Sequence, residues 1–234
     1  MVRYILSYKQ QKIKIKGLLE ITLKNFILVM TLMINLLLQP LLSTLHAEQA
    51  MSGNSIERKK ALRKLTIKPG PYRGAEAEAP LWMTELLENA LADPNPTVVA
   101  EAVDQIGNLK IRSLSSRLIT LYNESDSKFR GYSERVQNSI IETIGKNKGA
   151  ECSEFLSDLL EDDNGTPSGF TILRAIKNLN DAGLTAVLQD YAIRMETISL
   201  KLQEKGVDAL IYSNFERHGA LAREIADSLG GANE

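Results

Sequence analysis

The sequence has few of the residues on which catalysis and metal binding usually depend. Its 234 residues include a single cysteine, Cys152, and two histidines, His46 and His218. One cysteine cannot form an internal disulfide, and zinc sites usually take several ligands from Cys and His. Neither a G-x-S-x-G motif nor a Gly-rich phosphate-binding spacing occurs. We therefore expect no catalytic residues, no metal and no cofactor, and we expect Cys152 and His218 to be core residues.

Aromatic residues are also scarce, at 6% of the chain, and Gly and Pro occur at only a few points. Val, Ile, Leu and Ala are plentiful instead. This composition favours an all-α fold over a β-sandwich or a β-barrel. The length suits one domain with a sizeable core or a short array of repeats.

The first 47 residues differ from the rest in charge and hydropathy. They carry one acidic residue, Glu20, and six basic ones: Arg3, Lys9, Lys12, Lys14, Lys16 and Lys24. An uncharged run, FILVMTLMINLLL, covers residues 26–38, and Ala47 precedes the acidic Glu48. This order is typical of a signal peptide cleaved between Ala47 and Glu48. We expect an exported protein of the periplasm or cell envelope. The alternative is an uncleaved anchor, residues 26–45, in the inner membrane.

Removal of residues 1–47 leaves a net charge of about −6 on the remainder. An acidic protein lacks the basic surface that binding to a phosphate backbone requires. It is not attracted to anionic lipid headgroups either. We expect no nucleic-acid partner, and membrane contact only through an uncleaved N-terminal segment.

A pattern in residues 92–110, ADPNPTVVAEAVDQIGNLK, recurs after a shift of 38 positions. Asn95, before the first helix, matches Ser133, and both are good N-cap residues. Gly107 matches Gly145, which we expect just past each helix, where glycine closes a C-terminus easily. The apolar matches are Val98 with Val136, Ala102 with Ile140, Val103 with Ile141, and Ile106 with Ile144.

The match continues into a second helix, since Leu114, Leu118 and Leu121 correspond to Cys152, Leu156 and Leu159. A third copy follows after a shift of about 35. Its matches are Ile141 with Ile176, Ile144 with Leu179, Gly145 with Asn180, Cys152 with Val187, and Leu156 with Tyr191. Two helices per unit of about 38 residues are typical of a helical solenoid.

The stretch LLENALADPNPTVVAEAVDQIGNL, residues 86–109, resembles the HEAT-repeat family, in an exported bacterial form. In that family a helix ends in an Asp-Pro turn, and the next carries Val, small residues and an Ile-Gly or Leu-Gly end. The resemblance covers residues 81–195 and departs from the family at Val99, where an Arg is common. It implies a short right-handed α-solenoid of helix pairs. We expect the repeats in residues 81–183, after an N-terminal helix and a Pro/Gly-rich loop in residues 48–80.

Residues 184–234 follow a different pattern, with apolar residues at alternating intervals of four and three. They are Leu184, Leu188, Tyr191, Met195, Ile198 and Leu202, then Ile211, Phe215, His218, Ala222, Ile225 and Leu229. Such spacing predicts two long helices packed at a shallow angle, with Gly206 between them. This C-terminal helical hairpin is expected to cap the solenoid. The alternative is that it forms a homodimer.

The most acidic loop, LEDDNGTPSG in residues 160–169, does not fit a calcium-binding loop. The EF-hand spacing places Leu160, which cannot ligate calcium, at the first ligand position. We expect a solvated loop between repeats.

The remaining candidate for function is surface. The second helices of successive repeats line up along one face of a solenoid. The residues expected there are Arg112, Ser116, Arg117, Thr120, Glu154, Ser157, Asp158, Gln189 and Asp190. We expect a noncatalytic protein-interaction or scaffolding module with a protein partner. The alternative is a solute-binding or enzymatic protein with a cleft between the solenoid and the hairpin, for which Tyr72 and Trp82 are the aromatic candidates.

Overall fold

The computed structural model describes residues 26, 30, 52–65 and 79–231. The chain divides into two units, residues 1–48 and residues 49–234. Ala47, Glu48 and Tyr72 lie outside the described residues, so the predicted cleavage site is not part of the fold described below. Within the described residues, no helix is both long enough and apolar enough to span a bilayer.

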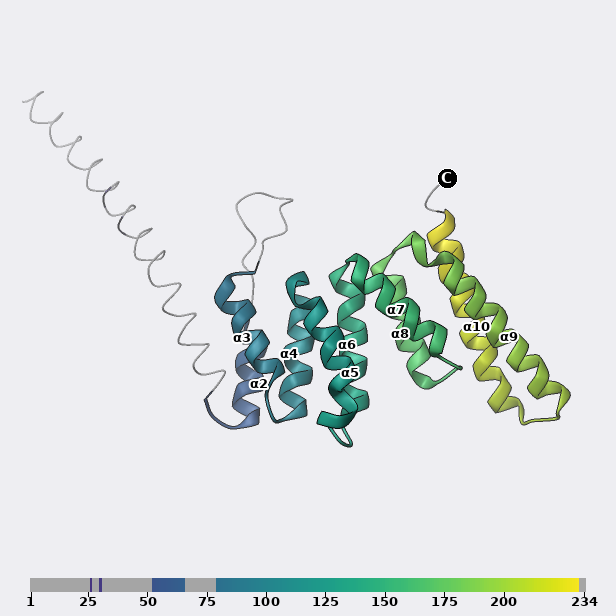
Figure 1. Ribbon diagram of the computed structural model, residues 1–234, viewed down its shortest axis with the longest axis horizontal. Coiled ribbons are helices and arrows are strands. Elements are labelled where there is room, and N and C mark those ends of the chain that lie inside the picture. The colour runs from purple at the N-terminus through teal and green to yellow at the C-terminus, as the bar shows by residue number, and fades with distance from the viewer. Residues whose placement is uncertain (1–25, 27–29, 31–51, 66–78, 232–234) are drawn as a thin grey trace, which may run out of the picture. The chain divides into compact units, whose positions relative to one another are not determined.

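The described residues are all-α, and no strand occurs among them. From residue 81 onward, the helices of the second unit follow one another closely along the chain (Figure 1). They are α2 (Ser55–Arg63), α3 (Leu81–Leu91), α4 (Pro96–Asn108), α5 (Ser115–Lys128), α6 (Ser133–Asn147), α7 (Ala150–Asp162), α8 (Pro167–Leu179), α9 (Thr185–Glu204) and α10 (Ala209–Gly230). Short 3₁₀ turns, Arg112–Leu114 and Ala182–Leu184, precede α5 and α9.

The helices form two rows in contact with each other. In the first row, α2 contacts α4, α4 contacts α6, α6 contacts α8 and α8 contacts α10. In the second row, α5 contacts α7 and α7 contacts α9, while α3, α5 and α7 each contact the first-row helix that follows them in the chain. α9 packs along α10. Each helix therefore covers an apolar stripe of its neighbours, as amphipathic helices must in a layered fold.

The contact between α4 and α6, at the centre of the first row, is completely buried. Val103 and Ile106 of α4, and Val136 and Ile144 of α6, have no exposed surface. The two segments that the sequence predicts as copies are thus both helices, and they pack directly against each other. Burying a side chain of this kind contributes about 1.5–3 kcal/mol to the free energy of folding.

The glycines of the repeat lie inside the helices, so the prediction that they close the C-termini is wrong. A Cβ on Gly107 would lie 2.8 Å from Oγ1 of Thr143 on α6. A Cβ on Gly145 would lie 2.5 Å from the carbonyl oxygen of Ala175 on α8. Both positions favour glycine because the neighbouring helix comes close, and the constraint is stronger at Gly145, where the contact is backbone, than at Gly107, where the nearest atom belongs to a side chain. Thr143 uses this proximity to donate a 3.0 Å hydrogen bond to the carbonyl oxygen of Val103.

Residues with positive φ come instead after α4, α6 and α8. Lys110, Lys148 and Asn180 have φ of 54°, 54° and 55°. The left-handed conformation expected of Asn180 is confirmed, but its partner in the alignment is Lys148 and not Gly145. Asn180 follows Lys148 by 32 positions, whereas Lys148 follows Lys110 by 38. The third copy therefore follows the second by 32 positions, which is fewer than the shift of about 35 that the sequence predicted.

Burial in α9 supports the shorter register. A shift of 32 matches Cys152 with Leu184 and Leu156 with Leu188, and all four side chains are buried. Val187, the predicted match of Cys152, is only half-buried. Sequence comparison missed this because the segment before α7, residues 148–149, is shorter than the segment before α5, residues 109–114, and because α7 and α8 are themselves shorter than α5 and α6.

The helix starts agree in part with the predicted caps. The side chain of Asn95 accepts a hydrogen bond from the backbone N–H of Thr97, as an N-cap should. Ser133 is already the first residue of α6, and the N-cap is Tyr132, which makes no side-chain cap bond. The prediction for Ser133 is therefore wrong by one residue.

Candidate functional site

The predicted partner surface lies on the second row. Ser116 and Thr120 on α5, Glu154 and Asp158 on α7, and Gln189 on α9 are exposed. Since α5 contacts α7 and α7 contacts α9, these side chains lie on neighbouring helices.

Four further residues of the same set extend this surface. Arg117 and Ser157 are half-buried on α5 and α7, while Arg112 is exposed in the 3₁₀ turn before α5 and Asp190 is exposed on α9. Arg117 lies 4.0 Å from the carboxylate of Glu124 on its own helix. An exposed ion pair of this length contributes little to stability, so the Arg117 side chain is available to a partner.

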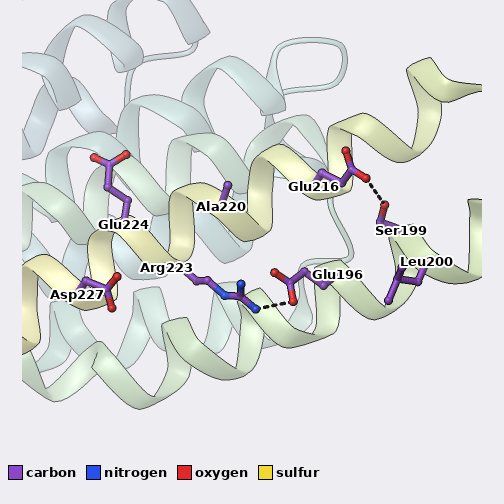
Figure 2. A pocket seen from close by; sticks show the side chains of 8 residues that line it. All are labelled: Glu196, Ser199, Leu200, Glu216, Ala220, Arg223, Glu224 and Asp227. Carbon is purple, nitrogen blue, oxygen red and sulfur yellow. Dashed lines mark hydrogen bonds and ion pairs between the residues drawn. The ribbon is translucent and has the colours of Figure 1, made fainter.

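A groove between α9 and α10 is the hollow that sequence reasoning missed (Figure 2). Its volume is about 690 Å³. The residues that line it are Glu196, Ser199 and Leu200 of α9 and Glu216, Ala220, Arg223, Glu224 and Asp227 of α10. The alternative function placed a cleft between the repeats and the C-terminal pair, whereas this groove lies between the two helices of the pair itself.

Several polar groups of the groove are held in place by neighbours. Arg223 of α10 forms an ion pair with Glu196 of α9 across the groove (Figure 2). The carboxylate of Glu216 accepts hydrogen bonds from Ser199 Oγ at 3.3 Å and from Gln203 Nε2 at 2.6 Å. At the other end, Glu224 pairs with Nζ of Lys177 on α8 at 3.0 Å.

The groove is acidic at its rim and apolar in part of its wall. Four carboxylates, those of Glu196, Glu216, Glu224 and Asp227, surround it, with Arg223 as the one basic residue of its lining. Leu200 is 59% exposed there. A groove of this composition attracts cations and apolar groups together.

A second cluster, of buried polar groups, joins the loop after α7 to the C-terminal pair. Tyr191 of α9 donates a 2.6 Å hydrogen bond to the carboxylate of Asp163. The same carboxylate accepts hydrogen bonds from the backbone N–H groups of Gly165, at 3.1 Å, and Thr166, at 3.2 Å. Burial, reinforced by the bond to Asp163, raises the pKa of the Tyr191 phenol far above its usual range, so the hydroxyl remains a donor.

His218 of α10 completes this cluster. Its ring has no exposed surface, as the sequence predicted for a core residue. Nδ1 lies 2.8 Å from the carbonyl oxygen of Asn214, and Nε2 lies 3.1 Å from that of Thr166. The ring also stacks at 3.7 Å on Phe170 of α8. Because both ring nitrogens face backbone oxygens inside the core, His218 holds α10 to the α7–α8 loop and does not meet solvent.

The loop in residues 160–169 is consequently less solvated than predicted. Asp163 is only 6% exposed and satisfies the backbone of its own turn. An Asp side chain that accepts hydrogen bonds from the backbone N–H groups two and three residues ahead forms an Asx-type turn. The sequence contained the Asp-Asn-Gly signal for such a turn, but nothing local indicated that Tyr191 would bury it.

The other candidates for chemistry are structural. Cys152 on α7 has no exposed surface, which confirms its predicted core position, and burial raises the pKa of its thiol. Trp82 on α3 is half-buried. Within the part of the chain that the structure describes, no three His, Cys, Asp or Glu side chains lie close enough to hold a metal ion.

No family model, no curated protein and no solved structure matches this chain, so its function is argued from its own residues.

Proposed function

We propose that this protein is a noncatalytic protein-interaction or scaffolding module of HEAT-repeat type. It is organised as a short right-handed α-solenoid of helix pairs, with α9 and α10 as the hairpin that caps the last pair. The observation that carries the proposal is a repeated contact: Gly107 faces Thr143 between α4 and α6, and Gly145 faces Ala175 between α6 and α8. Helix pairs laid in the same way extend a continuous surface along one side.

The second-row surface supports the proposal through its charges. Arg112 and Arg117 lie near α5's start, whereas Glu154 and Asp158 lie on the neighbouring α7. A basic strip beside an acidic one orients a partner with the opposite arrangement and slows the binding of others.

The buried state of the reactive side chains also favours a binding role. A nucleophile or a general base must reach its substrate. Cys152 and His218 have no exposed surface, and both ring nitrogens of His218 are already in contact with backbone oxygens.

Site-specific photo-crosslinking in the native cell tests this function. A photoreactive amino acid is introduced separately at Ser116, Glu154 and Gln189, which are exposed on α5, α7 and α9. We expect the same protein partner to crosslink from all three positions. The matched control is Arg174, which is exposed on α8 in the first row and should give no crosslink to that partner.

Two results would overturn the proposal. One is the absence of any protein crosslink at the three second-row positions in cells that contain the protein at its normal level. The other is a crosslink to a small molecule that the isolated protein then converts to a product.

The proposed location is the periplasm or cell envelope, with residues 1–47 as the signal segment. Sequencing the N-terminus of the protein isolated from its own cells tests this. Cleavage between Ala47 and Glu48 yields Glu48 as the first residue, whereas an intact Met1 in the inner-membrane fraction identifies residues 26–45 as an anchor. An intact chain in the cytosol contradicts export.

A further inference from the structure

We infer that a second copy of this chain binds end to end, with the outward face of α2 placed against the groove between α9 and α10. This inference deepens the proposed interaction function, on which it rests, by naming one partner. The two surfaces belong to the two ends of the first row. That row begins with α2, which contacts α4, and it ends with α10, which contacts α8.

The face of α2 that points away from α4 carries two lysines, one large apolar residue and one acid, Glu57, whose carboxylate caps the start of its own helix. α2 buries Leu62 at 1% exposure, and Leu65 just beyond the helix is buried too. Ile56, Lys60 and Lys64 follow one another at intervals of four on the opposite side, so they form one stripe. All three are exposed, and Ile56 is 59% exposed.

The groove lies on the outward face of α10, at the opposite end of the first row from α2. α10 buries Ala222, Ile225 and Leu229 toward the rest of the molecule. The groove residues Glu216, Ala220, Arg223 and Asp227 are exposed at intervals of four, three and four, which places them on the far side of the helix. Figure 2 shows Arg223 reaching toward Glu196 of α9 and Glu216 reaching toward Ser199 of α9.

The two faces are complementary in charge and in apolar surface. Lys60 and Lys64 carry the charges that the acidic rim attracts. Their aliphatic stems, together with Ile56, can cover Leu200 and Ala220 while the ammonium groups reach the carboxylates. Arg223 and Lys177 already pair with two of the four carboxylates of the lining, so the attraction for a basic helix comes mainly from the other two, Glu216 and Asp227.

The contact is heterologous, because the two surfaces differ. A contact of this kind does not close after two copies but continues into chains unless the rotation between copies closes a ring. It therefore differs from the homodimer through the C-terminal pair that the sequence offered as an alternative, in which the same surface would meet itself.

Cysteine crosslinking provides the direct test. The double variant Lys60→Cys/Ala220→Cys of the protein isolated from its own cells is treated with a short bis-maleimide. Cys152 does not interfere because it is fully buried. We expect a ladder of covalent multimers. Each single variant, and the double variant Lys60→Cys/Glu134→Cys with its exposed cysteine on α6, should give no ladder.

Charge reversal separates a specific contact from loose association. The variants Lys60→Glu/Lys64→Glu and Glu216→Lys/Asp227→Lys should each weaken self-association, measured by sedimentation velocity, by about tenfold or more. Mixing the two variants should restore it, because each then supplies the charge that the other has lost. The control reversal Glu134→Lys/Glu85→Lys, at exposed sites outside every proposed contact surface, should change it little. Circular dichroism of each variant establishes that it is folded.

Three outcomes would overturn the inference. The first is a protein that sediments as a monomer and gives no ladder. If Ser116, Glu154 and Gln189 still crosslink to another protein in that case, the proposed interaction function remains and only the self-assembly is wrong. The second is crosslinking of the single Ala220→Cys variant to a different protein, which assigns the groove to another partner. The third is a pair of reversed variants whose mixture does not associate.

Discussion

The centre of the first row and the outer part of the C-terminal pair contain similar apolar residues but bury them to different degrees. α6 is covered on both sides, by α4 and α8, and its Ile140 and Ile144 have no exposed surface. Along the C-terminal pair the predicted seam holds near its base, where Leu188 and Met195 are fully buried. It opens toward the turn, where Ile211 is 52% exposed.

The difference shows that the burial of an apolar side chain depends on how many helices pack around its own helix, and not on the apolar pattern of the sequence alone. A first-row helix such as α6 has a helix on either side, whereas the last pair is covered only on the side that faces α7 and α8. The same comparison predicts that mutations near α6 will destabilise the protein more than mutations at the C-terminal pair.

The largest effect is expected where two helices approach most closely. Gly145→Ala places a Cβ 2.5 Å from the backbone of Ala175, and backbone cannot rotate away as a side chain can. We expect the free energy of unfolding to fall by about 3 kcal/mol, measured by urea denaturation. The control is Gly230→Ala, at the end of α10, where no atom lies within 4 Å of the added Cβ. That change should be neutral or stabilise by up to about 1 kcal/mol. Equal effects at the two sites would contradict the comparison.

An intermediate effect is expected where the C-terminal pair joins the preceding loop. Tyr191→Phe removes the hydroxyl that donates to Asp163 and leaves that buried carboxylate with one partner fewer. A buried polar group that loses a partner costs about 1–3 kcal/mol, which thermal unfolding should detect as a lower Tm. Tyr132→Phe, at a residue that is 52% exposed, is the matched control and should leave the Tm unchanged. A Tm for Tyr191→Phe that equals the wild-type value would show that the cluster does not fasten the pair.

The smallest effect is expected at the rim of the groove. Lys177 and Glu224 form an ion pair with side chains 53% and 65% exposed. A double-mutant cycle with Lys177→Met and Glu224→Gln should give a coupling energy below about 0.5 kcal/mol. The contrast is the pair of Arg58 and Asp93, whose side chains are 17% and 7% exposed. Its coupling energy should be clearly larger, and a cycle that ranks the two pairs in the opposite order would refute the argument from burial.

The groove shows which features of a site the local apolar spacing of the sequence can predict and which it cannot. The helical spacing of residues 184–202 predicted α9, and that of residues 211–229 predicted α10. The groove could not be predicted in the same way, because it is lined by side chains of two helices and depends on which residues of one helix meet which residues of the other. Glu216 is an unremarkable exposed acid in the sequence, and it becomes part of a lining only because Ser199 and Gln203 of the other helix meet it.

The sequence by itself determined what depends on near neighbours in the chain. Its apolar periodicity specified the all-α class and the similarity of α4 to α6, and its single Cys152 and the in-register His218 were correctly expected in the core. Tertiary structure decided what depends on distant residues meeting. The preference for glycine at positions 107 and 145 comes from the approach of a neighbouring helix. The burial of Asp163 comes from Tyr191, which is 28 positions away. The reason is physical: a helix period repeats every few residues, whereas a close approach or a shared hydrogen bond exists only after the helices have packed.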